Sequence, residues 1–353
     1  MVETLLRCLE EKQTQGFADA PNTENPTREE NRMKAVIQNE YGSPDLLKLE
    51  EVETPVPAEG EVLVKIHAVS LNGSDWEGLV GDPFYARMNG LRRPRVKVLG
   101  GDIAGRVEAV GKNANLFQPG DEVFGETTSY HNGFAEYASV PEKGLARKPA
   151  GLTFDQAAAI PQAGVIALQG IRDKGQIRPG QRVLILGAGG SAGTFAVQLA
   201  KLYGAEVTGV DNTGKMDFLR SLGADHVIDY TREDFTRSGK KYDFILDIVG
   251  KRSIFAVQRA LAPGGRYFIV GGPVRRLLQI LILGPWIRRV TGKDLRILGV
   301  QPNRKDLETI TELCVTGQVV PIINRRYPLS EVPEALRSVG EGRARGKVVI
   351  TVD

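Results

Sequence analysis

A glycine-rich run that follows an apolar segment is the part of this sequence best suited to chemistry. Residues 183–201 read Val-Leu-Ile-Leu-Gly-Ala-Gly-Gly-Ser-Ala-Gly-Thr-Phe-Ala-Val-Gln-Leu-Ala-Lys, which predicts a strand, a tight turn and a helix. Glycines let the backbone of such a turn approach a ligand closely, because no side chain stands in the way. The unpaired amides at the start of the helix lie at the positive end of its dipole and can bind a diphosphate. The predicted phosphate-binding residues are Gly187, Gly190, Ser191, Ala192 and Gly193.

The sequence spacing between this turn and the next strand-ending acidic residue is informative. Residues 205–211, Ala-Glu-Val-Thr-Gly-Val-Asp, read as the next strand and end in Asp211. The spacing is near the ~20 residues expected of the carboxylate that binds the ribose in a dinucleotide fold. Strand, glycines, helix, strand and acid in this order favour a nicotinamide dinucleotide over a turn that serves packing alone.

The choice between NADH and NADPH is left open by two residues. The Asp211 carboxylate can accept hydrogen bonds from both ribose hydroxyls, and it repels a 2′-phosphate, which favours NADH. Lys215 lies one turn later, where its ammonium could balance the charge of Asp211 or contact the phosphate. We therefore expect NADPH or NADH as the cofactor.

The elements that must position this turn change in character along the chain. Residues 34–38, 61–69, 107–111, 121–125 and 133–140 read as short strands separated by Pro and Gly, which indicates a compact β-rich domain. From Thr153 onward, alanine-rich helical stretches and then alternating strands and helices are typical of a doubly wound parallel sheet. Residues 345–352 return to strand character and are expected to rejoin the first domain. The expected division is residues 33–155 with 305–353, and residues 156–304.

Length, charge and cysteine content agree with a two-domain α/β enzyme. The chain has 353 residues, and its 46 basic and 43 acidic residues leave a formal charge of +3, which indicates no nucleic-acid partner. Its two cysteines, Cys8 and Cys314, cannot build a disulfide framework or a four-thiolate zinc site. Residues 1–11 could form a short helix around Leu5, Leu6 and Leu9, and residues 16–32 are polar. Residues 1–32 lack the apolar core of a secretory signal and are expected to form a flexible arm. We therefore expect a cytoplasmic location.

Several sequence blocks resemble one enzyme family. With the glycine turn, residues 100–111, 117–125, 133–137, 222–230 and 346–349 are similar to zinc-free members of the medium-chain dehydrogenase/reductase superfamily, in the quinone oxidoreductase-like branch. The resemblance covers roughly residues 33–353. It implies a GroES-like β-rich domain built from both ends of the chain, a central Rossmann domain, an active-site cleft between them and a homodimer.

The resemblance also raises the question of a catalytic zinc. Alcohol-oxidising members carry zinc ligands at positions that here correspond to Asn72, Gly101 and either Gln162 or Ala163. An open catalytic zinc site needs about three N, O or S ligands from the protein. The three histidines of the chain lie in a strand pattern, a loop and the nucleotide domain, and they cannot replace this set (His67, His131 and His226). We expect no metal.

Chemistry without a Lewis acid favours an acceptor that is already electrophilic. Quinones and α,β-unsaturated carbonyls accept a hydride and place negative charge on an oxygen, which hydrogen-bond donors stabilise. We therefore expect a small hydrophobic electrophile as substrate. The alternative is a dinucleotide-binding protein of low turnover that acts as a redox sensor or a structural protein.

Other site residues follow from the resemblance alone. Asn72 would be a donor in the cleft, or a turn residue that caps its own backbone. Tyr85 and His131 lie in loops that approach the cleft in relatives, and each could be the proton donor, a role that solvent could also fill. Val165 stands where relatives often carry threonine near the nicotinamide amide. The remaining expected cofactor contacts are Tyr230, Val249, Gly250, Val270, Gly271, Gly272 and Lys347.

Residues 273–289 form an unusual apolar insert with arginines at both ends. Its apolar core, residues 277–287, is far shorter than the ~20 residues that span a bilayer. A lid over an apolar substrate pocket or a dimer contact is the favoured interpretation. A peripheral contact with a membrane surface is the alternative.

Overall fold

The computed structural model describes residues 31–127 and 131–352. Most of the expected arm, residues 1–32, and with it Cys8, therefore lies outside the described residues. Strand β1 (Arg32–Ile37) begins at the last residue of that arm and pairs with β2 (Lys48–Glu53) in a two-stranded sheet.

A six-stranded parallel sheet is built from the middle of the chain. Its order is β10-β9-β8-β11-β12-β13, and every neighbouring pair is parallel. The strands are β8 (Arg182–Leu186), β9 (Glu206–Asp211), β10 (His226–Asp229), β11 (Tyr242–Asp247), β12 (Leu261–Ile269) and β13 (Asp294–Ile297). The strand order reverses between β8 and β11, and this is where a doubly wound sheet binds its ligand. The expected doubly wound architecture is confirmed.

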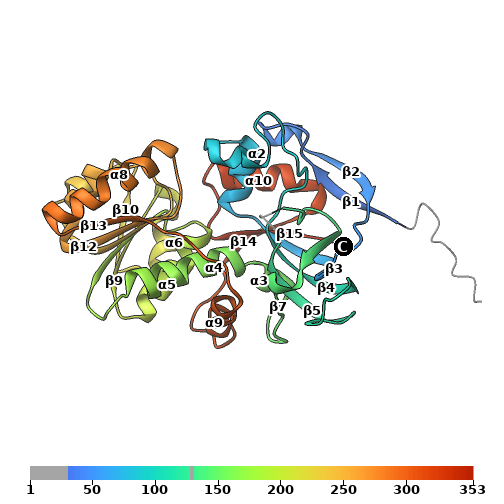
Figure 1. Cartoon of the computed structure of the whole chain (residues 1–353). Helices are drawn as coiled ribbons and strands as arrows, with labels where there is room; N and C mark the ends of the chain where they lie inside the picture. The colour runs from blue at the N-terminus through green and yellow to red at the C-terminus, as the bar shows by residue number, and fades with distance from the viewer. Residues whose placement is uncertain (1–30, 128–130, 353) are drawn as a thin grey trace, which may run out of the picture. The chain divides into compact units, whose positions relative to one another are not determined.

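Helices cover both faces of this sheet (Figure 1). Successive residues of β8 alternate between two hydrophobic clusters, with Val183 and Ile185 in one and Leu184 and Leu186 in the other. Helices on the first face are α4 (Pro161–Leu168), α5 (Ser191–Leu202), α6 (Met216–Ser221) and α9 (Arg304–Val315); those on the second are α7 (Ile254–Ala260) and α8 (Val274–Thr291). The apolar β strands are thus buried on both sides, as a parallel sheet requires.

A seven-stranded mixed sheet joins the two ends of the described chain. Its order is β14-β15-β3-β4-β5-β7, and β6 also pairs with β3. Its strands are β3 (Glu61–Ser70), β4 (Asp102–Val110), β5 (Glu122–Glu126), β6 (Tyr137–Pro141), β7 (Leu145–Arg147), β14 (Ile323–Pro328) and β15 (Lys347–Thr351). Strand β15 pairs antiparallel with β3, placing Val349 opposite Ser70. The prediction that the chain end rejoins the first sheet is confirmed.

Shorter elements complete the molecule. The helices α2 (Gly73–Val80), α3 (Phe154–Ala158) and α10 (Val332–Gly340) accompany the mixed sheet. A π-helical segment, η5 (Gln169–Gly175), continues α4. The remaining 3-10 turns are η1 (Pro44–Leu46), η2 (Phe84–Asn89), η4 (Glu142–Gly144), η6 (Thr213–Lys215), η7 (Phe235–Arg237) and η8 (Leu329–Glu331).

The hydrophobic interior is continuous between the two sheets. Phe124 of the mixed sheet and Ile185 of the parallel sheet belong to one buried cluster, and Leu307 of α9 also lies in it. Residues 33–353 form one compact unit. The expected domain boundaries at residues 155/156 and 304/305 therefore stay a prediction.

Candidate active site

The glycine turn has the backbone geometry that its sequence predicts. Strand β8 ends at Leu186, Gly187 follows with a φ of +79°, and α5 begins at Ser191. A Cβ atom on Gly193 would lie 2.2 Å from the carbonyl oxygen of Gly187, so only glycine permits this close approach of helix and turn. The N-cap residue, Gly190, has no side chain to cap the helix. The first amides of α5, including that of Ala192, are thus available to an anionic ligand.

Two neighbouring loops meet this turn at the same edge of the sheet. A Cβ on Gly187 would lie 2.7 Å from Cγ2 of Val249, and one on Gly250 would lie 2.7 Å from the carbonyl oxygen of Gly271. The loops that follow β8, β11 and β12 therefore converge beside the reversal of strand order. The structure brings these predicted cofactor residues together, and Val270 and Gly272 lie in the loop that follows β12.

Asp247 shapes one of these loops and was missed from the sequence. Its Oδ1 accepts hydrogen bonds from the backbone N–H groups of Val249 and Gly250 at 2.9 and 2.7 Å. Its Oδ2 accepts from the hydroxyl of Tyr267 at 2.9 Å. A signal was present, because an acid at the end of an otherwise apolar buried strand needs such partners.

Asp211 and Lys215 form a buried ion pair. The Lys215 Nζ lies 3.3 Å from Asp211 Oδ1, and both side chains are less than a tenth exposed. The backbone N–H of Gly189 donates to Asp211 Oδ2 at 2.9 Å, so the carboxylate also holds the glycine turn. The half-exposed Tyr230 follows β10 and donates its backbone N–H to the Asp211 carbonyl oxygen. Of the two roles expected for Lys215, this geometry shows the balancing of the Asp211 charge.

A buried polar cluster contains Asn72 and Gln162, two of the positions that the resemblance assigns to zinc ligands in alcohol-oxidising enzymes. The Lys347 Nζ donates to Asn72 Oδ1 at 2.6 Å and lies 3.4 Å from Asp102 Oδ2. The Asn72 Nδ2 donates to the same Asp102 oxygen at 2.9 Å, and the backbone N–H of Gln162 donates to Asp102 Oδ1 at 3.2 Å. Burial raises the pKa of Asp102 and lowers that of Lys347, and each partner opposes the shift in the other.

This cluster contains two of the expected site residues. Asn72 is buried, and Lys347 and Asp102 engage its carbonyl and one of its N–H groups, so its expected role as a donor in the cleft stays a prediction. The Lys347 side chain is fully buried, and its expected contact with the cofactor stays a prediction. Both residues contact Asp102, which lies 30 positions from Asn72 and 245 positions from Lys347 along the chain.

The donor set does not fit a catalytic zinc. Asn72, Gly101 and Gln162 offer at most neutral amide oxygens, whereas zinc sites are built from thiolate, imidazole and carboxylate ligands. The ammonium of Lys347 also lies among them. Within residues 31–127 and 131–352, no three His, Cys, Asp or Glu side chains are grouped as a metal site would require.

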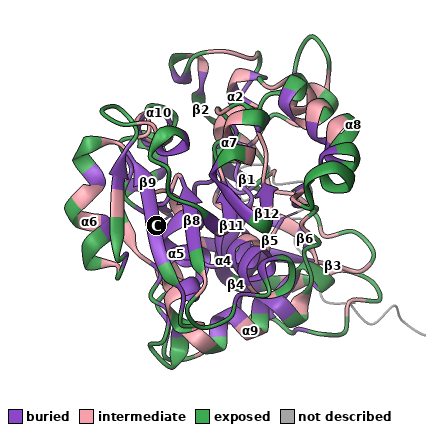
Figure 2. Cartoon of the chain, turned by 90° about the vertical axis from the view of Figure 1, so that its left-hand side faces the viewer, coloured by how far each residue is buried: buried purple, intermediate pink, exposed green. Residues whose placement is uncertain are grey.

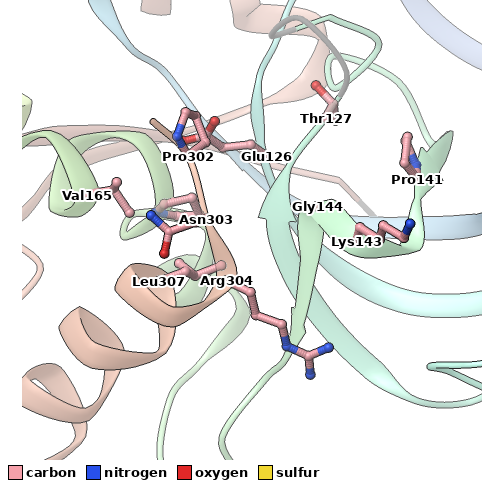
Figure 3. A pocket seen from close by; sticks show the side chains of 11 residues that line it. Glu126, Thr127, Pro141, Lys143, Gly144, Val165, Pro302, Asn303, Arg304 and Leu307 are labelled. Carbon is pink, nitrogen blue, oxygen red and sulfur yellow. The ribbon is translucent and has the colours of Figure 1, made fainter. Parts of the chain in front are cut away.

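A cavity of about 310 Å³ is lined by residues of β5, α4 and α9 (Figure 3), and Glu126 in this lining is the sheet neighbour of Asp102. It is lined by Glu126, Thr127, Val165, Asn303 and Arg304, among others, and Val165 was expected near the nicotinamide. Burial and then the charge of Asp102 raise the pKa of Glu126 to about 8, with Lys347 opposing. The raised pKa favours the protonated form of Glu126 at neutral pH. Sequence analysis missed it, since one glutamate at a strand end carries no signal of its burial.

Tyr85 lies beside the nucleotide loops, whereas His131 contacts another segment. The Tyr85 hydroxyl is 3.5 Å from the carbonyl oxygen of Gly272 and 3.4 Å from Glu77 Oε2. Burial and then Glu77 raise the pKa of Tyr85, so the phenol stays protonated. The His131 Nε2 lies 3.2 Å from Asn89 Nδ2, and neither His131 nor Tyr85 lines the 310 Å³ cavity.

Comparisons with known proteins agree with this geometry. Residues 58–150 match the family model "Alcohol dehydrogenase GroES-like domain", and residues 222–350 match "Zinc-binding dehydrogenase". The chain is 34% identical over 330 residues to 2-methylene-furan-3-one reductase of Solanum lycopersicum, covering 90% of this chain and 79% of that protein. The chain belongs to the medium-chain dehydrogenase/reductase superfamily. Within it, this is a zinc-free protein of the quinone oxidoreductase-like branch.

Two further comparisons each cover 91% of this chain. The mitochondrial NAD(P)H oxidoreductase RTN4IP1 of Mus musculus is 34% identical over 355 residues, covering 91% of this chain and 89% of that protein. The structure of the quinone oxidoreductase from Coxiella burnetii superposes with a TM-score of 0.82 at 29% identity, covering 91% of this chain and all of that one. This member of the medium-chain superfamily is an oxidoreductase that uses NADPH or NADH.

Proposed function

We propose that this oxidoreductase transfers a hydride from NADPH or NADH to a quinone or an α,β-unsaturated carbonyl compound without a metal. The observation that carries the proposal is the cavity beside the polar cluster, because it is lined by Glu126, a carboxyl group whose raised pKa suits it to donate a proton. By their names, the tomato relative reduces a methylene furanone and the Coxiella neighbour reduces quinones. Both compounds are small electrophiles that need no Lewis acid for reduction.

Different residues bind the nucleotide and supply the proton. The nicotinamide nucleotide, when bound, supplies the hydride. The α5 amides and the three loops at the sheet edge bind and orient it. Glu126 gives its carboxyl proton to the acceptor atom that gains the electron pair, either the carbon next to the carbonyl or a quinone oxygen. Solvent then returns a proton to the Glu126 carboxylate. Asn72 and Lys347 are positioning residues that hold Asp102 in place.

Location and assembly belong to the same proposal. Cys314 is a free and buried thiol, which suits a reducing compartment such as the cytoplasm. A homodimer is the assembly that the resemblance to the quinone oxidoreductase-like branch implies. A cytoplasmic homodimer is therefore the state we propose for the active protein.

Rapid-mixing kinetics with a panel of acceptors test the reductase function. We expect either reduced nucleotide to be oxidised in the presence of quinones and enones, with no loss of rate after dialysis against a chelator. Simple saturated ketones and aldehydes should react far more slowly, because they lack the conjugation that lowers the barrier. Tight nucleotide binding without turnover of any acceptor would contradict the proposal and support a redox sensor.

Substitution of Asp211 tests the basis of nucleotide preference. Asp211→Ser should improve NADPH binding relative to NADH by ~10-fold, because it removes one carboxylate charge near the 2′-phosphate. The ratio of the two dissociation constants, measured by nucleotide fluorescence, is the informative quantity, since loss of the Gly189 contact affects both nucleotides alike. Lys215→Met is the matched control and should shift the ratio in the opposite direction. If the ratio of the two dissociation constants were unchanged in both variants, Asp211 and Lys215 would not determine the nucleotide preference.

A further inference from the structure

The apolar insert forms a single long helix whose inner face is fixed by packing. Helix α8 buries Arg276, Ile280, Gly284 and Ile287, one or two residues from each turn. A Cβ on Gly284 would lie 2.7 Å from the carbonyl oxygen of Leu295, so α8 lies directly on strand β13. The orientation of the helix about its own axis is therefore determined, and the opposite face points away from the protein.

That outer face is apolar, contrary to the pattern of an ordinary surface helix. Leu281, Ile282 and Trp286 are 61, 70 and 59% exposed, and Leu278, one turn before the first two, is also exposed. Green, exposed segments run along α8 in Figure 2. A shallow hollow between the side chains is lined by residues of α8 alone. Soluble monomers rarely expose so many large apolar side chains in one place, and such a patch marks a contact surface.

The lid expected from the sequence has no support in these contacts. No residue of α8 lines the 310 Å³ cavity. The helix packs instead against α7 and β13, at the outer edge of the parallel sheet. The outer face of α8 is thus separate from the candidate active site.

The charge of α8 distinguishes between two possible partners, a second copy of this chain and a membrane surface. Residues 273–293 contain no Asp or Glu, and Arg275, Arg288 and Arg289 are exposed near the two ends of the helix. A second copy placed on this face by a two-fold axis would bring arginines toward arginines, which opposes association. Anionic lipid headgroups complement the arginines, and acyl chains complement the apolar side chains between them.

We propose that the outer face of α8 binds the surface of a membrane that contains anionic lipid. The helix lies in the plane of the interface, with Leu281, Ile282 and Trp286 at the boundary of the acyl chains and the arginines among the headgroups. No helix of the described chain is long and apolar enough to cross a bilayer. This surface would bring the enzyme to acceptors that dissolve in lipid, although the binding itself does not depend on the reductase activity.

Sedimentation with lipid vesicles tests the proposal on the full chain. We expect binding to phosphatidylcholine vesicles that contain phosphatidylserine, at least tenfold weaker binding to pure phosphatidylcholine, and weakening by salt. Leu281→Asp with Ile282→Asp should reduce binding to the anionic vesicles at least tenfold. Leu49→Asp with Val56→Asp is the matched control, because these apolar side chains are exposed on and near β2, and it should bind as the unmodified chain does.

Other results would overturn the proposal. Unreduced vesicle binding by the Leu281→Asp, Ile282→Asp variant would assign binding to another surface, and absence of binding by the unmodified chain would exclude it. A lipid-free dimer that dissociates only in this variant, measured by sedimentation equilibrium, would assign the face to a second copy instead. Nucleotide oxidation by the variant in solution reports on the reductase function separately, so failure of one proposal is distinguishable from failure of the other.

Discussion

Replacing Glu126 by glutamine is expected to lower kcat by ~10²–10⁴-fold, the usual contribution of a positioned acid. Glutamine keeps the shape of the side chain in the cavity but has no carboxyl proton to give to the acceptor. Nucleotide binding should be nearly unchanged, since Glu126 lies outside the glycine turn and its neighbouring loops. Steady-state kinetics with saturating nucleotide measure the effect as a fall in kcat without an equal rise in KM.

The pH profile distinguishes this role from a purely structural one. Because the pKa of Glu126 is raised to about 8, the proton-donating form predominates below that pH and is lost above it. The kcat of the unmodified enzyme should therefore fall as the pH rises through about 8, and this decline should be absent in the Glu126→Gln variant.

A matched control uses another glutamate of the same strand. Glu122 pairs with Arg106 and Lys148 at the surface, and Glu122→Gln should leave both kcat and its pH profile unchanged. If the decline above pH 8 persisted in Glu126→Gln, the proton would come from elsewhere. Tyr85→Phe and His131→Gln would then identify which of the two side chains, or solvent, supplies it.

Replacing Lys347 by methionine should lower the free energy of unfolding by ~3–5 kcal/mol, the cost of leaving one partner of a buried ion pair behind. The substitution removes the donor to the Asn72 carbonyl and the charge that faces Asp102, while both acceptors stay fully enclosed. Urea denaturation followed by circular dichroism measures the change.

The double variant provides the control for this prediction. Lys347→Met with Asp102→Asn leaves no uncompensated charge, so it should be more stable than Lys347→Met alone. If the two substitutions were additive, Lys347 and Asp102 would contribute independently and the pairing seen in the structure would not be what stabilises this region.

Local sequence patterns predicted several strands and the glycine turn. The apolar run, the glycines and the spacing to Asp211 identified the strand, the turn and the nucleotide-binding edge of the sheet. Alternation of apolar and polar residues identified the strand at residues 61–69. In each case the information lies within about 20 residues along the chain.

Contacts between distant residues could not be predicted in the same way. The pairing of Lys347 with Asp102 joins residues 245 positions apart, and no local pattern indicates it. The protonation of Glu126 depends on burial and on the Asp102 charge, which exist only after the sheets have packed. Helix α8 shows the same limit, because its sequence is apolar on all sides and only packing on β13 decides that Arg276 is buried while Ile282 is exposed.

The position of β15 in the mixed sheet has a consequence for biosynthesis. Strand β3 emerges from the ribosome early, yet its neighbour β15 is translated some 280 residues later, counting from the register of Ser70 with Val349. Until then one side of β3 and the carboxylate of Asp102 lack their final partners. Contacts over such sequence separations form slowly, and nascent chains with incomplete sheets are prone to aggregate. The growing polypeptide is therefore a natural client for chaperones throughout most of its translation.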